Sequence, residues 1–212
     1  MTDMPRMTDT DFDQALVSAA FALGAQAGWR KVSPAAAALR AGLDLGMARA
    51  RFGSCGAILR KFGEMADCHA LQGALAEGAV RDRLFDTLLR RFDFLQLHRE
   101  GVVALLRFLP AAPPLGVCLA HATVESMGWL LEAAGVSATG LRGEVRKRGL
   151  ALVWGYGVRA WLRDETPDLA ATMAAVDEAL TKADALAVRF TPAPPAAAAT
   201  DLPSPEGPSE VA

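Results

Sequence analysis

The stretch SPAAAALRAGLDLGMARARF, residues 33–52, sets the pattern for the start of the chain. Ser33 followed by Pro34 is typical of a helix start, because the serine hydroxyl accepts a hydrogen bond from an unpaired backbone amide and proline suits the first turn. Gly42 is a natural stop, since glycine readily adopts the left-handed conformation that ends a helix. Asp44 can then cap a second short helix that fills the rest of the stretch. We therefore expect two helices of about eight residues joined by a turn.

The remaining sequence also has the spacing of helices. Within residues 11–27, and again in the ladder that begins with Val80, Leu84 and Leu88, apolar residues recur three or four positions apart. No segment alternates strictly between apolar and polar residues, as a half-buried strand would. Glycine and proline breakers delimit the expected helices, which cover residues 11–27, 34–41, 44–52, 54–68, 79–98, 101–109, 115–134, 141–163 and 168–188. The sequence therefore predicts an all-α fold of about nine helices.

Composition limits the class of protein. Of the 212 residues, 52% are hydrophobic and 22% are charged, which predicts a buried core rather than a disordered chain. The mean hydropathy of +0.21 comes largely from alanine, and no apolar run reaches the roughly 18 to 20 residues of a membrane-spanning helix. The three cysteines lie far apart, and the first residues lack the apolar segment of a secretory signal. We expect a cytoplasmic protein with no transmembrane segment.

Four regions follow from these patterns. Residues 1–10 are expected to be disordered, residues 11–52 to form a three-helix head, and residues 53–190 to form a helical body. Residues 191–212 are rich in proline and alanine and contain three acids and no base. This last region cannot bury enough apolar surface to offset the entropy of ordering, so we expect a disordered tail.

Positive charge is concentrated near the head. The whole chain has 22 basic and 24 acidic residues, but residues 30–61 contain seven basic residues and only Asp44 as an acid. The seven are Arg30, Lys31, Arg40, Arg49, Arg51, Arg60 and Lys61. Two short helices joined by a glycine-containing turn have the organisation of a helix-turn-helix, whose second helix enters the major groove of DNA. A solvated face of short amphipathic helices is the alternative interpretation of the same pattern.

A resemblance to a known family supports DNA binding. The residues that resemble the N-terminal domain of tetracycline-repressor-type (TetR-like) transcription regulators, over residues 11–68, are Gly28-Trp29, Val32-Ser33, Ala41-Gly42-Leu43, Phe52, Ser54, Ile58 and Leu59. The resemblance implies a DNA-binding head whose fourth helix leads into a ligand-binding and dimerising body. This sequence departs from the family at two positions. Arg49 stands where an aromatic residue is common, and Cys55 stands where a phosphate-contacting lysine is common.

A second resemblance concerns residues 125–182. The residues that carry it are Gly128-Trp129, Glu132 to Gly135, Gly149 to Val153, Trp161-Leu162, Asp164, Ala171 to Ala174 and Asp177. They are similar to the C-terminal half of the lipid-binding accessory proteins of ubiquinone biosynthesis, which share the repressor fold. The Asn-Trp-Tyr stretch of that family is replaced here by residues 140–148. This resemblance implies an alternative function, a lipid-binding accessory protein with a degenerate helix-turn-helix that no longer binds DNA.

The expected sites follow from the charge pattern and the resemblances. A regulator of this kind is a homodimer that binds a palindromic operator, and the last two helices would form the dimer as a four-helix bundle. The residues expected to contact DNA are Arg30, Lys31, Ser33 and Ser54 on phosphates, and Arg49 and Arg51 on bases. An apolar small molecule or lipid would bind in the body. The residues expected to surround it are Leu105, Phe108, Met127, Trp129, Leu130 and Trp154.

Catalysis and metal binding have little support in the sequence. Cys118 and His121 share one expected helix, but no third group is present to orient them as a nucleophilic pair. Cys68 and His69 lack the spacing of zinc ligands. We therefore predict a protein that is not an enzyme and that uses no metal ion and no cofactor.

Overall fold

The computed structural model describes residues 8–74 and 77–190, without the side chains of residues 187–190. Within these ranges the chain forms nine α-helices and no strand. The helices are α1 (Asp9–Ala27), α2 (Pro34–Ala41), α3 (Leu45–Arg51), α4 (Cys55–Leu71), α5 (Val80–Gln96), α6 (Arg99–Phe108), α7 (Pro113–Ala133), α8 (Gly140–Trp161) and α9 (Ala170–Phe190). Two single-turn 3-10 helices, η1 (Trp29–Lys31) and η2 (Leu109–Ala111), precede α2 and α7. The all-α fold predicted from the sequence is confirmed.

The expected helices are all present, and their ends differ by a few residues from the predicted ones. α1 begins at Asp9 rather than at residue 11, because Thr8 caps it. The Thr8 hydroxyl accepts a hydrogen bond from the Asp11 amide over 3.1 Å, and the Asp11 carboxylate accepts one from the Thr8 amide. The rest of the expected disordered regions, residues 1–7 and 191–212, lies outside the described residues.

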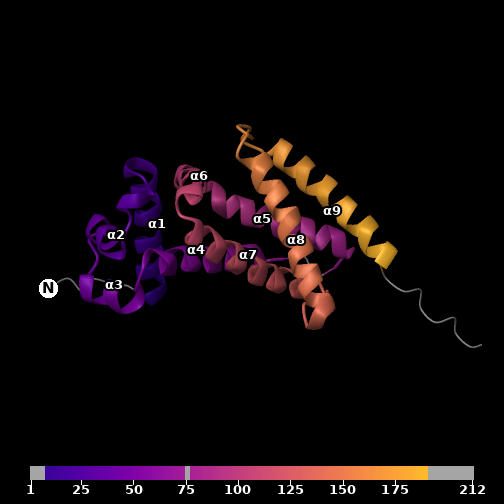
Figure 1. Ribbon diagram of the computed structural model, residues 1–212, viewed down its shortest axis with the longest axis horizontal. Helices are drawn as coiled ribbons and strands as arrows, with labels where there is room; N and C mark the ends of the chain where they lie inside the picture. Colours follow the sequence, from indigo (N-terminus) through magenta and orange to yellow (C-terminus); the bar gives the residue numbers. More distant parts are fainter. Residues whose placement is uncertain (1–7, 75–76, 191–212) are drawn as a thin grey trace, which may run out of the picture.

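The helices form an elongated molecule with a head at one end (Figure 1). We call α1, α2 and α3 the head, and α4 to α9 the body. α4 runs from the head into the body, where it packs on α5 and α7. α7 also packs on α8, and α8 packs along α9 at the end of the molecule away from α3.

Head and body share one hydrophobic core. Phe21 of α1 stacks on Phe62 of α4 with ring centroids 3.9 Å apart, and Trp29 meets Phe21 edge-on at 5.0 Å. The indole N–H of Trp29 donates a hydrogen bond to the Gly101 carbonyl in α6 over 2.9 Å. Gly101 lies so close to α1 that a Cβ atom there would come within 2.6 Å of the Phe21 carbonyl oxygen. Aromatic packing and a buried hydrogen bond therefore fix the head to α6.

The core of the body lies between α5, α8 and α9. Phe92 of α5 stacks on Trp154 of α8 with ring centroids 4.3 Å apart. Gly157 allows these helices to approach, because a Cβ atom there would lie 2.8 Å from Val176 of α9 and 2.9 Å from Phe92. Trp161 is fully buried, and its indole N–H donates to the Gln96 side chain. Two of the four tryptophans, Trp154 and Trp161, thus fill this interior together with Phe92.

Candidate nucleic-acid interface and ligand-binding interior

The two short helices of the head begin and end as the sequence predicts. Ser33 caps α2 by accepting a hydrogen bond from the Ala36 amide over 3.1 Å, and Gly42 ends that helix with a left-handed φ of 66°. Asp44 caps α3 by accepting a hydrogen bond from the Met47 amide over 2.7 Å. α2 packs on both α1 and α3. The result is a helix-turn-helix in which α3 is held at the surface of the head.

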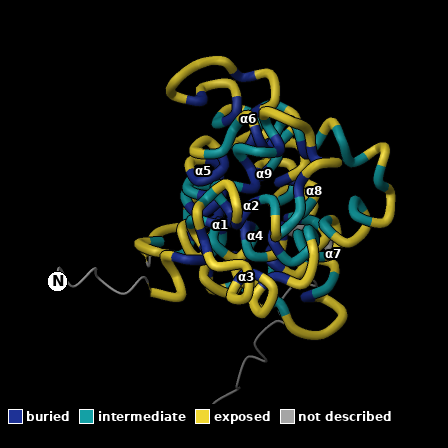
Figure 2. Tube along the Cα trace, turned by 90° about the vertical axis from the view of Figure 1, so that its left-hand side faces the viewer, coloured by how far each residue is buried: buried dark blue, intermediate teal, exposed yellow. Residues whose placement is uncertain are grey.

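α3 exposes nearly all of its side chains. Ala48 is buried against the core, whereas Leu45, Met47 and Arg49 are exposed. Arg49 forms no hydrogen bond or ion pair with any of the described residues. Figure 2, which views the molecule from the head end, shows α3 as one of the exposed segments that face the viewer. Arg49 is therefore free to contact a partner outside the chain.

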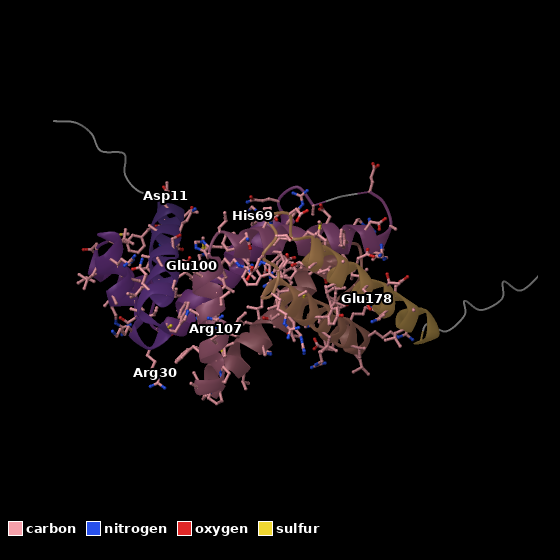
Figure 3. The ribbon with its side chains drawn as sticks, turned by 90° about the horizontal axis from the view of Figure 1, so that it is seen from above. Asp11, Arg30, His69, Glu100, Arg107 and Glu178 are labelled. Atoms are coloured by element: carbon pink, nitrogen blue, oxygen red, sulfur yellow. The ribbon has the colours of Figure 1, made fainter. Side chains whose placement is uncertain are left out.

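Other basic side chains of the head region are also unpaired. Arg30 and Lys31 lie on η1, Arg40 lies in the last turn of α2, and Arg60 lies on α4. All four are exposed, and none forms an ion pair with an acid in the described ranges. In Figure 3 the Arg30 side chain extends away from the head. Arg40 and Arg60 are not among the predicted contact residues, and their charge is the only sequence signal that could have suggested them.

Arg51, which the sequence suggests as a base contact, forms an ion pair within the head. Its Nε and Nη2 atoms donate to the two carboxylate oxygens of Asp13 in α1, over 2.6 and 2.9 Å, and its Nη1 atom lies 3.0 Å from Asp9. Only 7% of the Asp13 side chain is exposed, and Lys61 lies 3.4 Å from it. Burial alone would raise the pKa of Asp13, but the hydrogen bonds and charges of Arg51 and Lys61 hold that pKa below its ordinary value. Arg51 therefore neutralises a buried carboxylate between α1 and α3.

The start of α4 carries no lysine. Ser54 caps the helix by accepting a hydrogen bond from the Ala57 amide over 3.3 Å. Cys55 is half-buried, and burial raises the pKa of its thiol, so this position is uncharged at neutral pH. A phosphate at this end of α4 would have to be held by backbone amides and by the Ser54 hydroxyl.

Five of the six residues expected to surround a ligand lie in or against the core of the body. Met127 and Leu130 of α7 are fully buried, Leu105 and Trp154 are nearly so, and Phe108 is partly buried. They belong to one continuous apolar cluster contributed by α6, α7 and α8.

Trp129 is the exception among the six residues. Its side chain is 70% exposed. It borders an open, polar hollow between α7 and α8, together with Glu125, Glu132 and Lys147. The reason is helical geometry: Trp129 is two residues from Met127, and at about 100° per residue it lies on the opposite side of α7.

The body contains a charged cluster that was not predicted from the sequence. Arg91 of α5 is 5% exposed, and its Nη2 atom lies 3.3 Å from the carboxylate of Asp67 in α4. The same carboxylate accepts a hydrogen bond from the Ser126 hydroxyl of α7 over 2.7 Å, and the Arg91 guanidinium lies 4.7 Å from the centre of the Trp154 ring. Burial raises the pKa of Asp67 and lowers the pKa of Arg91.

A sequence signal for this cluster exists. Arg91 follows Leu84 and Leu88 and precedes Leu95 at the spacing of one helix face, so it occupies a core position of the apolar ladder. The neighbouring Arg90 is the more exposed of the two, and it pairs with Asp86 over 2.8 Å. A basic residue at a core position predicts a buried partner or a ligand.

α8 carries an exposed apolar stripe. Leu141, Val145, Leu152 and Tyr156 are exposed to 84, 65, 76 and 46%, and their spacing places them on one face of the helix. α9 packs beside α8 without covering these side chains. A stripe of this kind is typical of a surface that is buried in an assembly.

The described residues offer little for other chemistry. None of their helices is long and apolar enough to cross a membrane, and no group of three or more His, Cys, Asp or Glu side chains among them could hold a metal ion. Cys118 and His121 are both exposed on α7.

The chain is similar to solved structures of transcriptional regulators. A TetR transcriptional regulator from Nitrosomonas europaea matches with a TM-score of 0.65 and 19% sequence identity, over 81% of this chain and 97% of that one. A tetR-family transcriptional regulator from Streptomyces coelicolor matches with a TM-score of 0.59 and 19% identity, over 87% of this chain and 85% of that one. No model of a protein family matches the sequence, and no curated protein matches it. The chain therefore has the fold of the TetR-family transcriptional regulators.

Proposed function

We propose that this protein is a dimeric DNA-binding transcriptional regulator that is controlled by a small ligand bound in its body. The observation that carries the proposal is the surface helix α3, which presents Arg49 without a partner in the described part of the chain. A short exposed helix held by a helix-turn-helix is the element that enters a major groove. The similar solved structures are described as transcriptional regulators, which supports this function over a lipid-binding accessory role.

The contacts with DNA divide into two kinds. Arg30, Lys31 and Ser33, at the start of α2, and Ser54, at the start of α4, contact phosphates and fix the orientation of the head. Arg49 reaches the base edges, where an arginine recognises guanine through two hydrogen bonds. Arg51 contributes indirectly, because its ion pair with Asp13 ties α3 to α1.

Dimerisation places two heads on one operator. The exposed stripe of Leu141, Val145, Leu152 and Tyr156, with the neighbouring α9, packs against its symmetry mate as a four-helix bundle. A twofold dimer presents two copies of α3, and a palindromic operator presents two matching half-sites. The ligand occupies the apolar interior near Leu105, Phe108, Met127, Leu130 and Trp154, and its binding changes the affinity for DNA.

The test is a fluorescence anisotropy titration of DNA that flanks the coding region of this protein. Arg49→Ala should weaken binding by about 1 to 3 kcal/mol, the value of one arginine–base contact. The matched control is Arg163→Ala, another exposed arginine with no ion pair among the described acids, which lies in the loop between α8 and α9. It should bind DNA like the original protein.

Two further readouts belong to the same experiment. Binding should weaken steeply as salt rises, because phosphate contacts release counterions. Light scattering should give about twice the chain mass of 22.3 kDa. Absence of any complex at low salt, or a monomer at micromolar concentration, contradicts the proposal.

A further inference from the structure

The interior of the body contains an arginine whose hydrogen-bonding capacity is only partly used. Arg91 lies among four helices, with Asp67 of α4 and Ser126 of α7 on its polar side and Trp154 of α8 against its face. Its Nη2 atom pairs with Asp67, whereas its Nε and Nη1 atoms are buried and have no hydrogen-bond partner among the described residues.

Such an arrangement is costly unless another group completes it. A guanidinium carries one N–H on Nε and two on Nη1, and a buried donor without an acceptor destabilises the fold by about 1 to 3 kcal/mol, more if it is charged. Buried polar groups in folded proteins are nearly always paired, so an unpaired one points to a missing acceptor. Asp67 does not supply it in this structure, because Ser126 and Nη2 of Arg91 both contact its Oδ1 atom, and neither Nε nor Nη1 of Arg91 has a partner among the described residues.

The surroundings define the acceptor. Met127 is next to Ser126 and Leu130 is one helical turn further on, and both are fully buried, so apolar surface begins directly beside the polar cluster. Arginine binds carboxylates and phosphates through two parallel hydrogen bonds. A monoanionic carboxylate fits better than a phosphate, because a second negative charge adds to the cost of desolvation in an apolar interior.

We propose that Arg91 binds the carboxylate of an otherwise apolar monocarboxylic acid, in an internal site completed by Asp67, Ser126 and Trp154. This inference deepens the proposed function, on which it rests, because it names the chemical class of the regulatory ligand. The side chain of Asp67 keeps 15% exposure, so the polar edge of the cluster lies near the surface.

Charge balance assigns a role to Asp67. Arg91 and an ionised Asp67 sum to zero, so an entering carboxylate leaves one uncompensated negative charge unless Asp67 takes up a proton. Burial and the nearby charge of Glu64 both raise the pKa of Asp67, which Arg91 and Ser126 only partly oppose. Proton uptake leaves a neutral Asp67 carboxyl, the cationic Arg91 and the anionic ligand in one cluster of zero net charge.

The experiment compares octanoate with 1-octanol, which has the same apolar chain and no charge, by isothermal titration calorimetry of the full chain without DNA. Octanoate should bind about tenfold more tightly or better, the preference expected for a charge-assisted hydrogen bond. Arg91→Met should remove the preference. Asp67→Asn mimics the protonated carboxyl and should bind octanoate at least as tightly as the original protein does at pH about 8.

A charge-neutral double variant is the control for a failure to fold. If Arg91→Met does not fold by circular dichroism, the double variant Asp67→Asn, Arg91→Met replaces both charges together, and it should bind octanoate no better than 1-octanol. The inference is overturned if the variant without Arg91 keeps the octanoate preference. It is also overturned if none of hexanoate, octanoate, decanoate and phenylacetate binds the original protein more tightly than its matching alcohol.

DNA binding is measured separately, so the two proposals fail separately. If the protein binds DNA but no carboxylate, only the proposed class of ligand is contradicted. If the protein binds a carboxylate but not DNA, only the proposed role as a DNA-binding regulator is contradicted.

Discussion

The head and the body each contain an arginine–aspartate pair that joins two helices, and the two pairs differ in how many of the arginine nitrogens have an acceptor. In the head, Arg51 meets both carboxylate oxygens of Asp13 and also reaches Asp9. In the body, Arg91 meets Asp67 through one nitrogen at 3.3 Å, and two of its nitrogens have no acceptor within residues 8–74 and 77–190. Residue types are the same in the two places, but the Arg51 side chain is 29% exposed whereas the Arg91 side chain is 6% exposed. The number of donors left over separates a structural pair from a binding site.

The largest expected effect is the loss of the pair in the head. Arg51→Ala leaves the Asp13 carboxylate buried with only Lys61 near it, which should lower the free energy of unfolding by about 2 to 3 kcal/mol. Arg49→Ala, two residues earlier on α3, is the matched control and should change stability by less than about 0.5 kcal/mol. Urea denaturation measures both. Equal stability of the two variants would mean that the Arg51 pair does not hold α3 to α1.

Removal of the Arg91–Asp67 pair in the body should leave the free energy of unfolding unchanged or raise it, unlike removal of the pair in the head. Asp67→Asn combined with Arg91→Met removes an incompletely bonded ion pair, and such replacements are often neutral or stabilising by about 1 kcal/mol or more. The ligand-free double variant should therefore unfold at the same or a higher urea concentration than the original protein. A loss of more than about 2 kcal/mol would place Arg91 in the same structural class as Arg51.

The smallest expected effect is that pH changes the stability contributions of Asp13 and Asp67 in opposite directions. The folded pKa of Asp13 is lowered, so its contribution to stability is present above the unfolded value of about 3.9 and is lost as pH falls through the folded pKa. The folded pKa of Asp67 is raised, so its contribution is present below that unfolded value and is lost as pH rises through the folded pKa.

Urea denaturation between about pH 3 and pH 8 measures the difference. Asp13→Asn should approach the original protein in stability as pH falls, and Asp67→Asn should gain on it as pH rises. Parallel pH profiles for the two variants would contradict the assignment of opposite shifts.

The sequence predicts the helices well because the signals that start and stop them are local. Ser33, Asp44 and Ser54 each accept a hydrogen bond from an amide three residues later, so short stretches are sufficient to recognise them. Side-chain roles depend on residues far along the chain. Arg49 and Arg51 look alike in the sequence, and only the fold brings Asp13, 38 residues from Arg51, to one of them.

Two residues were predictable in principle from helical periodicity. Trp129 had to lie opposite Met127, yet it was predicted beside Met127 in the ligand site. Arg91 had to face the same side as Leu88, and no role was predicted for it. What periodicity does not supply is the partner: the positions of Asp67, Ser126 and Trp154 around Arg91 come from three other helices.

The hydrogen bond from the Trp29 indole to the Gly101 carbonyl limits which segment of this chain could be moved to another protein as a unit. The head ends in sequence near residue 52, but in space its aromatic core closes on α6, which begins at Arg99. A cut after residue 52 would leave the indole without its acceptor and uncover Phe21. A head moved from this chain to another protein must therefore bring a matching α6, with a glycine at the position of Gly101. In this chain, the unit that can be exchanged is set by that contact rather than by the order of the helices along the sequence.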